Sequence, residues 1–169
     1  LDAERLITDG NGIVPSTAFR FFNVYGPRQD PSSPYSGVIS IFIDRALRSL
    51  PLRIDGDGEQ SRDFIHVSDV VQGLLLGLEA LLDNGTAAKG HGAVYNLCSE
   101  TGLTIGNLVS EVEHHLATAI LRTYGPARSG DIRHSIGSSS RAQEHLGFSC
   151  KMSFSEGLGD LIDFLQRES

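Results

Sequence analysis

The chain has 169 residues, of which 40% are hydrophobic and 21% charged, an ordinary balance for one globular domain with its own core. Its formal net charge is −7, and the acidic residues are scattered along the sequence. This argues against nucleic acid as a partner, because phosphate neutralisation needs a concentrated basic face. Cys98 and Cys150 lie far apart and predict free thiols in a reducing compartment.

No segment of the sequence predicts a membrane span. The longest apolar run, around residues 74–82, is interrupted by Gly77 and Glu79 and is far shorter than the ~20 residues that a spanning helix needs. No signal peptide is visible, and we expect a cytoplasmic protein. Because the sequence lacks an initial methionine and opens directly into a helical pattern, we expect the native protein to begin before Leu1.

Apolar periodicity and turn residues divide the chain into short strands and helices. In chain order, the predicted elements are a helix tail at 1–7, a strand at 17–24, a helix at 37–50, strands at 52–54 and 63–67, a helix at 68–82, a strand at 94–97, a helix at 104–116, a strand at 119–124, and helices at 139–146 and 155–167. This alternation predicts an α/β fold that is too short to be a complete doubly wound domain.

Several residues indicate where the predicted helices begin and end, where a loop lies, and which helix face is buried. Ser68 and Thr104 are expected as helix N-caps, and Gly147 as the residue that ends the helix at 139–146. The segment 26–37 contains three prolines and predicts an extended loop. In the helix at 68–82, the side chains expected to face the core are Val70, Val71, Leu74, Leu75 and Leu78.

The turn Gly56-Asp57-Gly58 resembles the start of a dinucleotide fingerprint but does not complete it. Position 61 is Ser instead of Gly, and the residues that follow have a strand pattern instead of a helix. We interpret the turn as a tight connection before an exposed arginine, Arg62. Arg62 and Arg128 could each serve a phosphate site, since a guanidinium group offers a rigid fork of donors, or could lie on the surface in solvent.

Other kinds of chemistry have no support in the sequence. His114 and His115 are adjacent, so they cannot face one metal together, and the remaining histidines have no carboxylate or thiol at a ligand-like spacing. We therefore expect no metal site. A nucleophilic serine motif of the hydrolase type is also absent.

Four blocks in the same order resemble one enzyme family. They are RFFNVYGPR at 20–28, SPYSGVISIF at 33–42, DGDGEQSRDFIHV at 55–67 with Asp69, and GD at 130–131. Together they resemble the C-terminal half of UDP-sugar 4-epimerases and their relatives, the NAD-dependent nucleotide-sugar epimerases and dehydratases of the extended short-chain dehydrogenase/reductase family. The block at 33–42 is most similar to hexose and N-acetylhexosamine 4-epimerases.

The resemblance implies a division of the chain. Residues 1–28 would be a remnant of the NAD-binding Rossmann domain, with its last strand or strands, and 29–169 would be the nucleotide-sugar binding domain. Most of the Rossmann half would be missing. The family's Tyr-x-x-x-Lys pair is absent, and Leu1-Asp2-Ala3-Glu4 is similar to the segment just after that lysine. The chain alone would then carry no catalytic residues and be inactive.

The resemblance also implies roles for individual residues toward a UDP-sugar and NAD. Asn23 would bind the sugar diphosphate, Arg62 and Arg128 its phosphates, and Asp131 the ribose hydroxyls. The backbone around Val38 and Arg53 would bind the pyrimidine edge. Phe21 and Phe22 would lie beside the nicotinamide of NAD, which the missing half would hold. Asp55 departs from the family pattern, because relatives often have an aromatic residue there beside the base.

Three hypotheses follow. The chain is part of a nucleotide-sugar 4-epimerase, whose parent enzyme would be a homodimer. Alternatively, it belongs to a 4,6-dehydratase, reductase or decarboxylase of the same family. The third hypothesis is a non-catalytic module that binds a nucleotide sugar.

Overall fold

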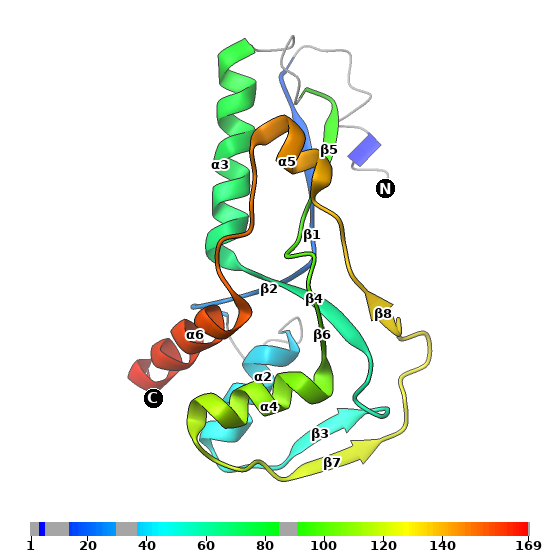
Figure 1. Cartoon of the computed structure of the whole chain (residues 1–169), viewed down its shortest axis with the longest axis vertical. Coiled ribbons are helices and arrows are strands. Elements are labelled where there is room, and N and C mark those ends of the chain that lie inside the picture. The colour runs from blue at the N-terminus through cyan, green and yellow to red at the C-terminus, as the bar shows by residue number, and fades with distance from the viewer. Residues whose placement is uncertain (1–3, 6–13, 30–36, 85–90, 169) are drawn as a thin grey trace.

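Parallel pairing between strands far apart in the sequence organises this fold. The computed structural model describes residues 4–5, 14–29, 37–84 and 91–168 (Figure 1). Each of three strand pairs is parallel: β1 (Thr17–Phe21) with β5 (Ala93–Leu97), β2 (Asn23–Tyr25) with β4 (Ser61–His66), and β3 (Leu52–Asp55) with β7 (Arg122–Gly125). The chain is therefore an α/β protein, as predicted.

Strand β4 is the centre of the largest sheet. Besides β2, it pairs in parallel with β8 (His134–Ser135) and antiparallel with β6 (Gly102–Thr104). The sequence did not predict β6 or β8, which are only three and two residues long. The predicted strand at 17–24 is in fact two strands, because the chain leaves β5 at Phe22 and joins β4 at Asn23.

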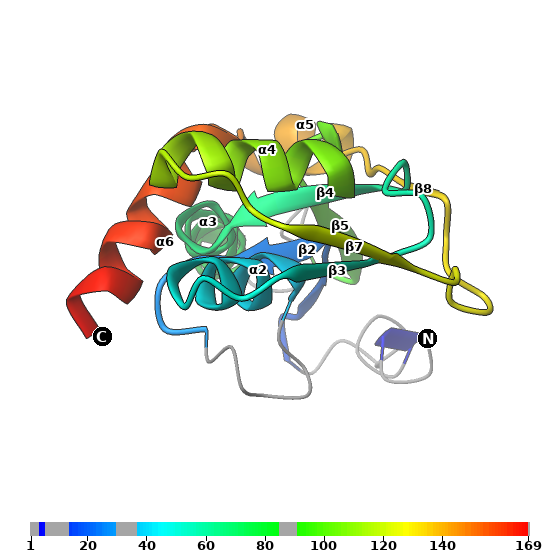
Figure 2. The same cartoon turned by 90° about the horizontal axis from the view of Figure 1, so that it is seen from below.

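Three helices and the β3–β7 pair enclose one hydrophobic core at the lower end of the molecule in Figure 1. The helices are α2 (Val38–Leu47), α4 (Ile105–Leu116) and α6 (Phe154–Glu168). Fully buried side chains of this core include Ile43, Leu52, Leu108, Leu158 and Leu161. Thr104 caps α4 as predicted, since its Oγ1 accepts a hydrogen bond from the backbone N–H of Asn107 at 3.1 Å. Figure 2 views this end from below.

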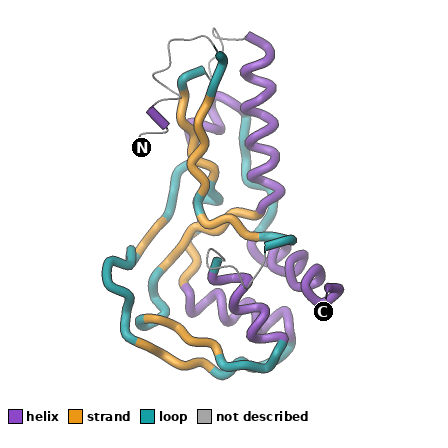
Figure 3. The backbone as a smooth tube through the Cα atoms, turned by 180° about the vertical axis from the view of Figure 1, so that it is seen from behind, coloured by secondary structure: helices purple, strands orange, loops and turns teal. Residues whose placement is uncertain are grey.

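A second core lies between β1, β5 and the helices α3 (Val67–Asn84) and α5 (Ser140–Leu146). It contains Ile65, Tyr95, Leu97 and Phe148, all at most 1% exposed. Gly147 ends α5 in the left-handed conformation (φ 69°), as predicted. Figure 3 shows from behind that β1 and β5 run alongside α3 at the end of the molecule away from α4.

Helix α3 differs from the prediction in two respects. It begins at Val67, so Ser68 lies inside the helix instead of capping it. Of the five side chains expected in the core, only Val70 is buried; Val71, Leu74, Leu75 and Leu78 are 42–53% exposed. These four residues and Leu82 form one exposed face, which we name the apolar stripe.

Glycines take the place of the expected leucines against the sheet. A Cβ at Gly73 would lie 2.6 Å from Cδ1 of Leu97, and a Cβ at Gly77 would lie 2.4 Å from Cζ of Phe19. The helix therefore approaches β1 and β5 through its smallest residues, with Leu76 and Ala80 partly buried beside them. This close approach turns the larger side chains of the stripe outward.

Two buried carboxylates connect distant segments. Asp63 accepts hydrogen bonds from the backbone N–H groups of Ser99, Glu100 and Gly137 and from the hydroxyl of Ser99. Asp69, in the first turn of α3, accepts from the backbone N–H groups of Lys151 and Met152. Burial without such partners would be costly, so these contacts fix the segments around β4 and α3.

The remaining predictions concern termini, loops and thiols. Residues 4 and 5 are helical, whereas the rest of the predicted helix tail and residues 30–36 of the proline loop lie outside the described residues. Cys98 and Cys150 are free thiols, as expected. No helix in the described part of the chain is long and apolar enough to cross a membrane.

Candidate functional site

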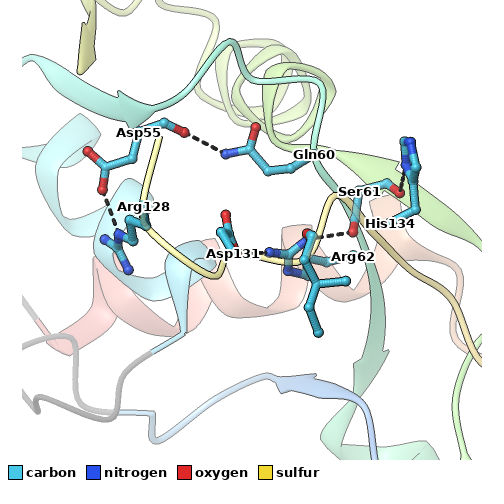
Figure 4. Close-up of polar contacts among 8 residues, drawn as sticks. Asp55, Gln60, Ser61, Arg62, Arg128, Asp131 and His134 are labelled. Carbon is cyan, nitrogen blue, oxygen red and sulfur yellow. Dashed lines mark hydrogen bonds and ion pairs between the residues drawn. The ribbon is translucent and has the colours of Figure 1, made fainter. Parts of the chain in front are cut away.

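A cavity of about 390 Å³ lies between α2, the turn that joins β3 to β4, and the loop after β7. All six residues predicted to bind a nucleotide sugar line it: Asn23, Val38, Arg53, Arg62, Arg128 and Asp131. They come from five segments that span more than 100 positions of the sequence. Figure 4 shows the polar contacts around its charged wall.

Arg62 is held rigidly in this wall. Its guanidinium donates to the carbonyl oxygens of Ser61 at 2.8 Å and Ile132 at 2.6 Å, and to the carboxylate of Asp131 (Figure 4). Its side chain is only 17% exposed, so the prediction of an exposed arginine was wrong. The acceptors in the loop after β7 turn the guanidinium toward the cavity and away from solvent.

Arg128 is held differently. Its side chain is 77% exposed, and its Nε donates to the Asp55 carboxylate at 2.7 Å. The other oxygen of Asp55 accepts from Nε of Arg53 at 3.0 Å. Arg128, and then Arg53, holds the pKa of Asp55 below its ordinary value, although burial acts in the opposite direction. Asp55 is therefore an anion at neutral pH.

Part of the cavity lining is apolar. It is formed by side chains of α2, β3 and the start of α4: Val38, Ile41, Phe42, Ile54 and Ile105. A cavity lined by apolar side chains and three guanidinium groups suits a ligand with a flat, weakly polar part and an anionic part. Asp55 and Gln60 also line the cavity. Asp55 was noticeable in the sequence through its departure from the family pattern, whereas no sequence feature indicated Gln60.

Asn23 enters the cavity from β2. Its side-chain amide donates to the backbone carbonyl of Asp63 at 2.9 Å, which fixes its orientation. The two predicted NAD-contacting residues, Phe21 and Phe22, do not line this cavity. Phe21 is 48% exposed at the end of β1, and the ring of Phe22 lies against Gly137, where an added Cβ would be 2.4 Å from it.

A second cavity is lined by His66, Ser68, Asp69 and Asp160 among other residues. His66 is buried, its Nδ1 lies 2.8 Å from the hydroxyl of Ser68, and its Nε2 lies 3.5 Å from the Asp160 carboxylate. Burial lowers the pKa of His66, while Asp160 and Asp69 oppose that shift. Within the described ranges, no group of three His, Cys, Asp or Glu side chains could hold a metal ion.

Comparison with known proteins defines the family. The sequence pattern of the NAD dependent epimerase/dehydratase family matches residues 6–98, more than half of the chain. The chain belongs to this family. Among its relatives, the UDP-glucose 4-epimerase of Mycolicibacterium smegmatis is 34% identical over 87% of the chain. UDP-glucuronic acid decarboxylase 1 of Arabidopsis thaliana is 32% identical over 98% of the chain.

A solved structure of the same family has the same fold. The UDP-glucose 4-epimerase of Thermotoga maritima, determined with UDP-glucose, superposes on 90% of the chain with a TM-score of 0.81 and 37% identity. The chain spans 46% of that protein, 44% of the mycobacterial relative and 36% of the plant relative. It therefore corresponds to less than half of each of these members of the NAD-dependent epimerase/dehydratase family.

Proposed function

We propose that this chain carries the nucleotide-sugar site of an NAD-dependent 4-epimerase that inverts C4 of a UDP-hexose or UDP-N-acetylhexosamine. The observation that carries this proposal is the cavity itself, where six residues that the family resemblance assigned to a UDP-sugar converge. Three guanidinium groups on one wall provide the positive charge that a diphosphate requires.

Each residue then has a distinct task. Arg62 and Arg128 bind the two phosphates, and the fixed guanidinium of Arg62 sets their position. Asp131 offers a carboxylate oxygen to the ribose hydroxyls, and the backbone near Val38 and Arg53 binds the pyrimidine edge against the apolar part of the cavity lining. Asn23, oriented by its bond to Asp63, contacts the sugar diphosphate.

We propose that NAD is not bound at the turn between β3 and β4. The turn Gly56-Asp57-Gly58 leads into strand β4 instead of a helix, so it lacks the helix N-terminus that receives a pyrophosphate. In a 4-epimerase NAD provides the transient oxidation at C4. The residues of this chain bind and orient the sugar nucleotide, and we expect no turnover from the chain alone.

We further propose that the activity needs an additional NAD-binding half, which packs on the apolar stripe of α3. The side chains of the stripe are 42–75% exposed and Phe21 of β1 is 48% exposed, and exposed apolar surface of this extent is unfavourable in water. The lengths of the relatives support an additional half as the partner of this surface, because the chain spans less than half of each relative. In this arrangement residues 1–28 belong to the NAD-binding domain and 29–169 to the substrate domain, and the complete enzyme is a homodimer.

A decarboxylase is the second candidate, since the plant UDP-glucuronic acid decarboxylase matches almost the whole chain at 32% identity. The cavity described here would bind the same UDP group in both enzymes. The complete protein separates the two candidates: a 4-epimerase interconverts UDP-glucose and UDP-galactose, whereas a decarboxylase releases CO₂ from UDP-glucuronic acid. A protein that binds these ligands and converts none of them would be the non-catalytic module.

Binding to the chain itself tests the site directly. We expect isothermal titration to detect UDP and UDP-glucose, and expect Arg62→Ala to weaken binding by about 10-fold to 100-fold, the loss of a charge-assisted phosphate contact. Arg133→Ala is the matched control, because Arg133 pairs with Asp57 outside the cavity. Absence of UDP binding, or an equal loss in both variants, would contradict the proposal.

A further inference from the structure

Asp55 occupies an unusual position for a residue in an anion site. It ends strand β3 inside the cavity and uses both carboxylate oxygens on cavity arginines, Oδ1 on Arg53 and Oδ2 on Arg128. Its side chain is 19% exposed, so solvent screens these pairs only in part. Two of the three guanidinium groups of the wall are therefore already paired with one internal anion.

We infer that Asp55 is a competing anion that lowers the affinity of this cavity for a nucleoside diphosphate by occupying Arg128 and Arg53. The inference rests on the proposed function and identifies a residue that sets the affinity of the cavity for its ligand. A diphosphate that enters the cavity must either displace the Asp55 carboxylate from Arg128 or share that guanidinium with it. In both cases the carboxylate also repels the phosphates.

The contrast with Arg62 supports this assignment. Arg62 has two carbonyl acceptors besides Asp131, so neutral groups keep its charge in place whether or not a ligand is bound. The guanidinium of Arg128 is largely exposed, and a carboxylate is its hydrogen-bond acceptor. Exchange of that acceptor for a phosphate oxygen is therefore possible without breaking the backbone structure around it.

The fold holds Asp55 in this position. The amide of Gln60 donates to the Asp55 carbonyl at 2.7 Å, and the residue opposite Asp55 in the strand pair is Gly125. A Cβ at Gly125 would lie 2.9 Å from Nη2 of Arg53 and 3.2 Å from Oδ1 of Asp55. Glycine at that position leaves room for the Arg53–Asp55 pair as it stands, and a larger residue would require the end of the Arg53 side chain to shift.

Titration of the full chain with UDP and with uridine tests the inference. We expect Asp55→Asn to bind UDP about fivefold to tenfold more tightly than the parent chain, because one negative charge beside the diphosphate is removed. Uridine, which has no phosphate, should bind both with equal affinity. Asp57→Asn is the matched control: it removes the same charge two residues away, where Asp57 pairs with Arg133 outside the cavity.

The outcomes separate the inference from the proposed function. The inference is supported if Asp55→Asn, or a second variant, Asp55→Ser, binds UDP more tightly than the parent chain while Asp57→Asn does not. If the parent chain binds UDP and both Asp55 variants bind it equally or more weakly, Asp55 is no competitor and the proposed function still stands. A weaker affinity of the variants for uridine would instead make Asp55 a direct contact of the nucleoside. If neither the parent chain nor the variants bind UDP, both proposals fail.

Discussion

Asp63 and Ser99 are 36 positions apart, yet one oxygen of the buried Asp63 carboxylate accepts both the backbone N–H and the hydroxyl of Ser99 at 2.8 Å. The other oxygen accepts from Glu100 and Gly137. Asp63 directly follows Arg62, so this set of bonds fixes the strand that presents Arg62 to the cavity.

We expect Asp63→Asn to lower the free energy of unfolding by about 2–4 kcal/mol, because an amide NH₂ would face buried backbone N–H groups. Urea denaturation measures this change. Asp44→Asn is the control: Asp44 pairs with Arg48 on the surface, and its loss should cost less than about 1 kcal/mol. Equal costs in the two variants would contradict a structural role for the Asp63 carboxylate.

The stability of the chain should depend on pH through His66. Burial lowers the pKa of His66 in the folded state, so below its ordinary value of 6.5 the unfolded chain takes up a proton that the folded chain does not. Stability is therefore complete above pH 6.5 and decreases as the pH falls from 6.5 toward the folded-state pKa.

Urea denaturation at pH 7.5, 6.5 and 5.5 tests this dependence. His66→Gln should show a smaller loss of stability over that interval than the parent chain. His114→Gln, at an exposed position of α4, should retain the parent slope. If the free energy of unfolding of the His66 variant fell with pH as steeply as that of the unsubstituted chain, other groups would cause the acid sensitivity.

Gly73 permits the close contact between α3 and β5. An added Cβ would lie 2.6 Å from Leu97, which is fully buried, so we expect Gly73→Ala to destabilise the fold by about 1–3 kcal/mol despite the higher helix propensity of alanine. Gly159→Ala in α6 is the counterpart. Its Cβ would meet His115 at an ordinary 3.4 Å, and we expect a neutral or slightly stabilising change in the melting temperature.

The apolar stripe should make the isolated chain associate with itself and bind hydrophobic dyes. We expect Leu75→Gln with Leu78→Gln to reduce both effects and to change the free energy of unfolding by less than about 1 kcal/mol, because both side chains are half exposed. Sedimentation velocity and dye fluorescence measure the outcome. A loss of several kcal/mol would show that these leucines belong to the core of the chain itself.

Local sequence signals predicted the local features of this structure. Thr104 as an N-cap and Gly147 as a helix end depend on bonds within one turn, and both are observed. The blocks that contain Asn23, Arg62 and Asp131 identified residues that meet in one cavity, although no spacing rule could state how the arginines would be paired. Asp55 lies opposite Gly125 in the register of β3 with β7, and the Gln60 amide donates to the Asp55 carbonyl, so both positions depend on tertiary contacts.

The features that the sequence did not predict depend on tertiary contact. Leucine periodicity in α3 indicated a buried face, but glycines at 73 and 77 allow the opposite face to approach the sheet more closely. The strand at 17–24 divides at Phe22 because its two parts have different partners. Strands β6 and β8 are too short to have a pattern and exist because β4 pairs with them.

The pairing of β1 with β5 has a consequence during synthesis. Thr17 is aligned with Ala93, 76 residues further along the chain. At 5–20 residues per second, a ribosome needs about 4–15 s to deliver that partner. Throughout this interval β1, with two phenylalanines among its five residues, lacks its partner β5, and an exposed strand edge of this kind is prone to aggregation. The segment 17–21 is thus a site that a chaperone of nascent chains would protect until β5 has left the ribosome.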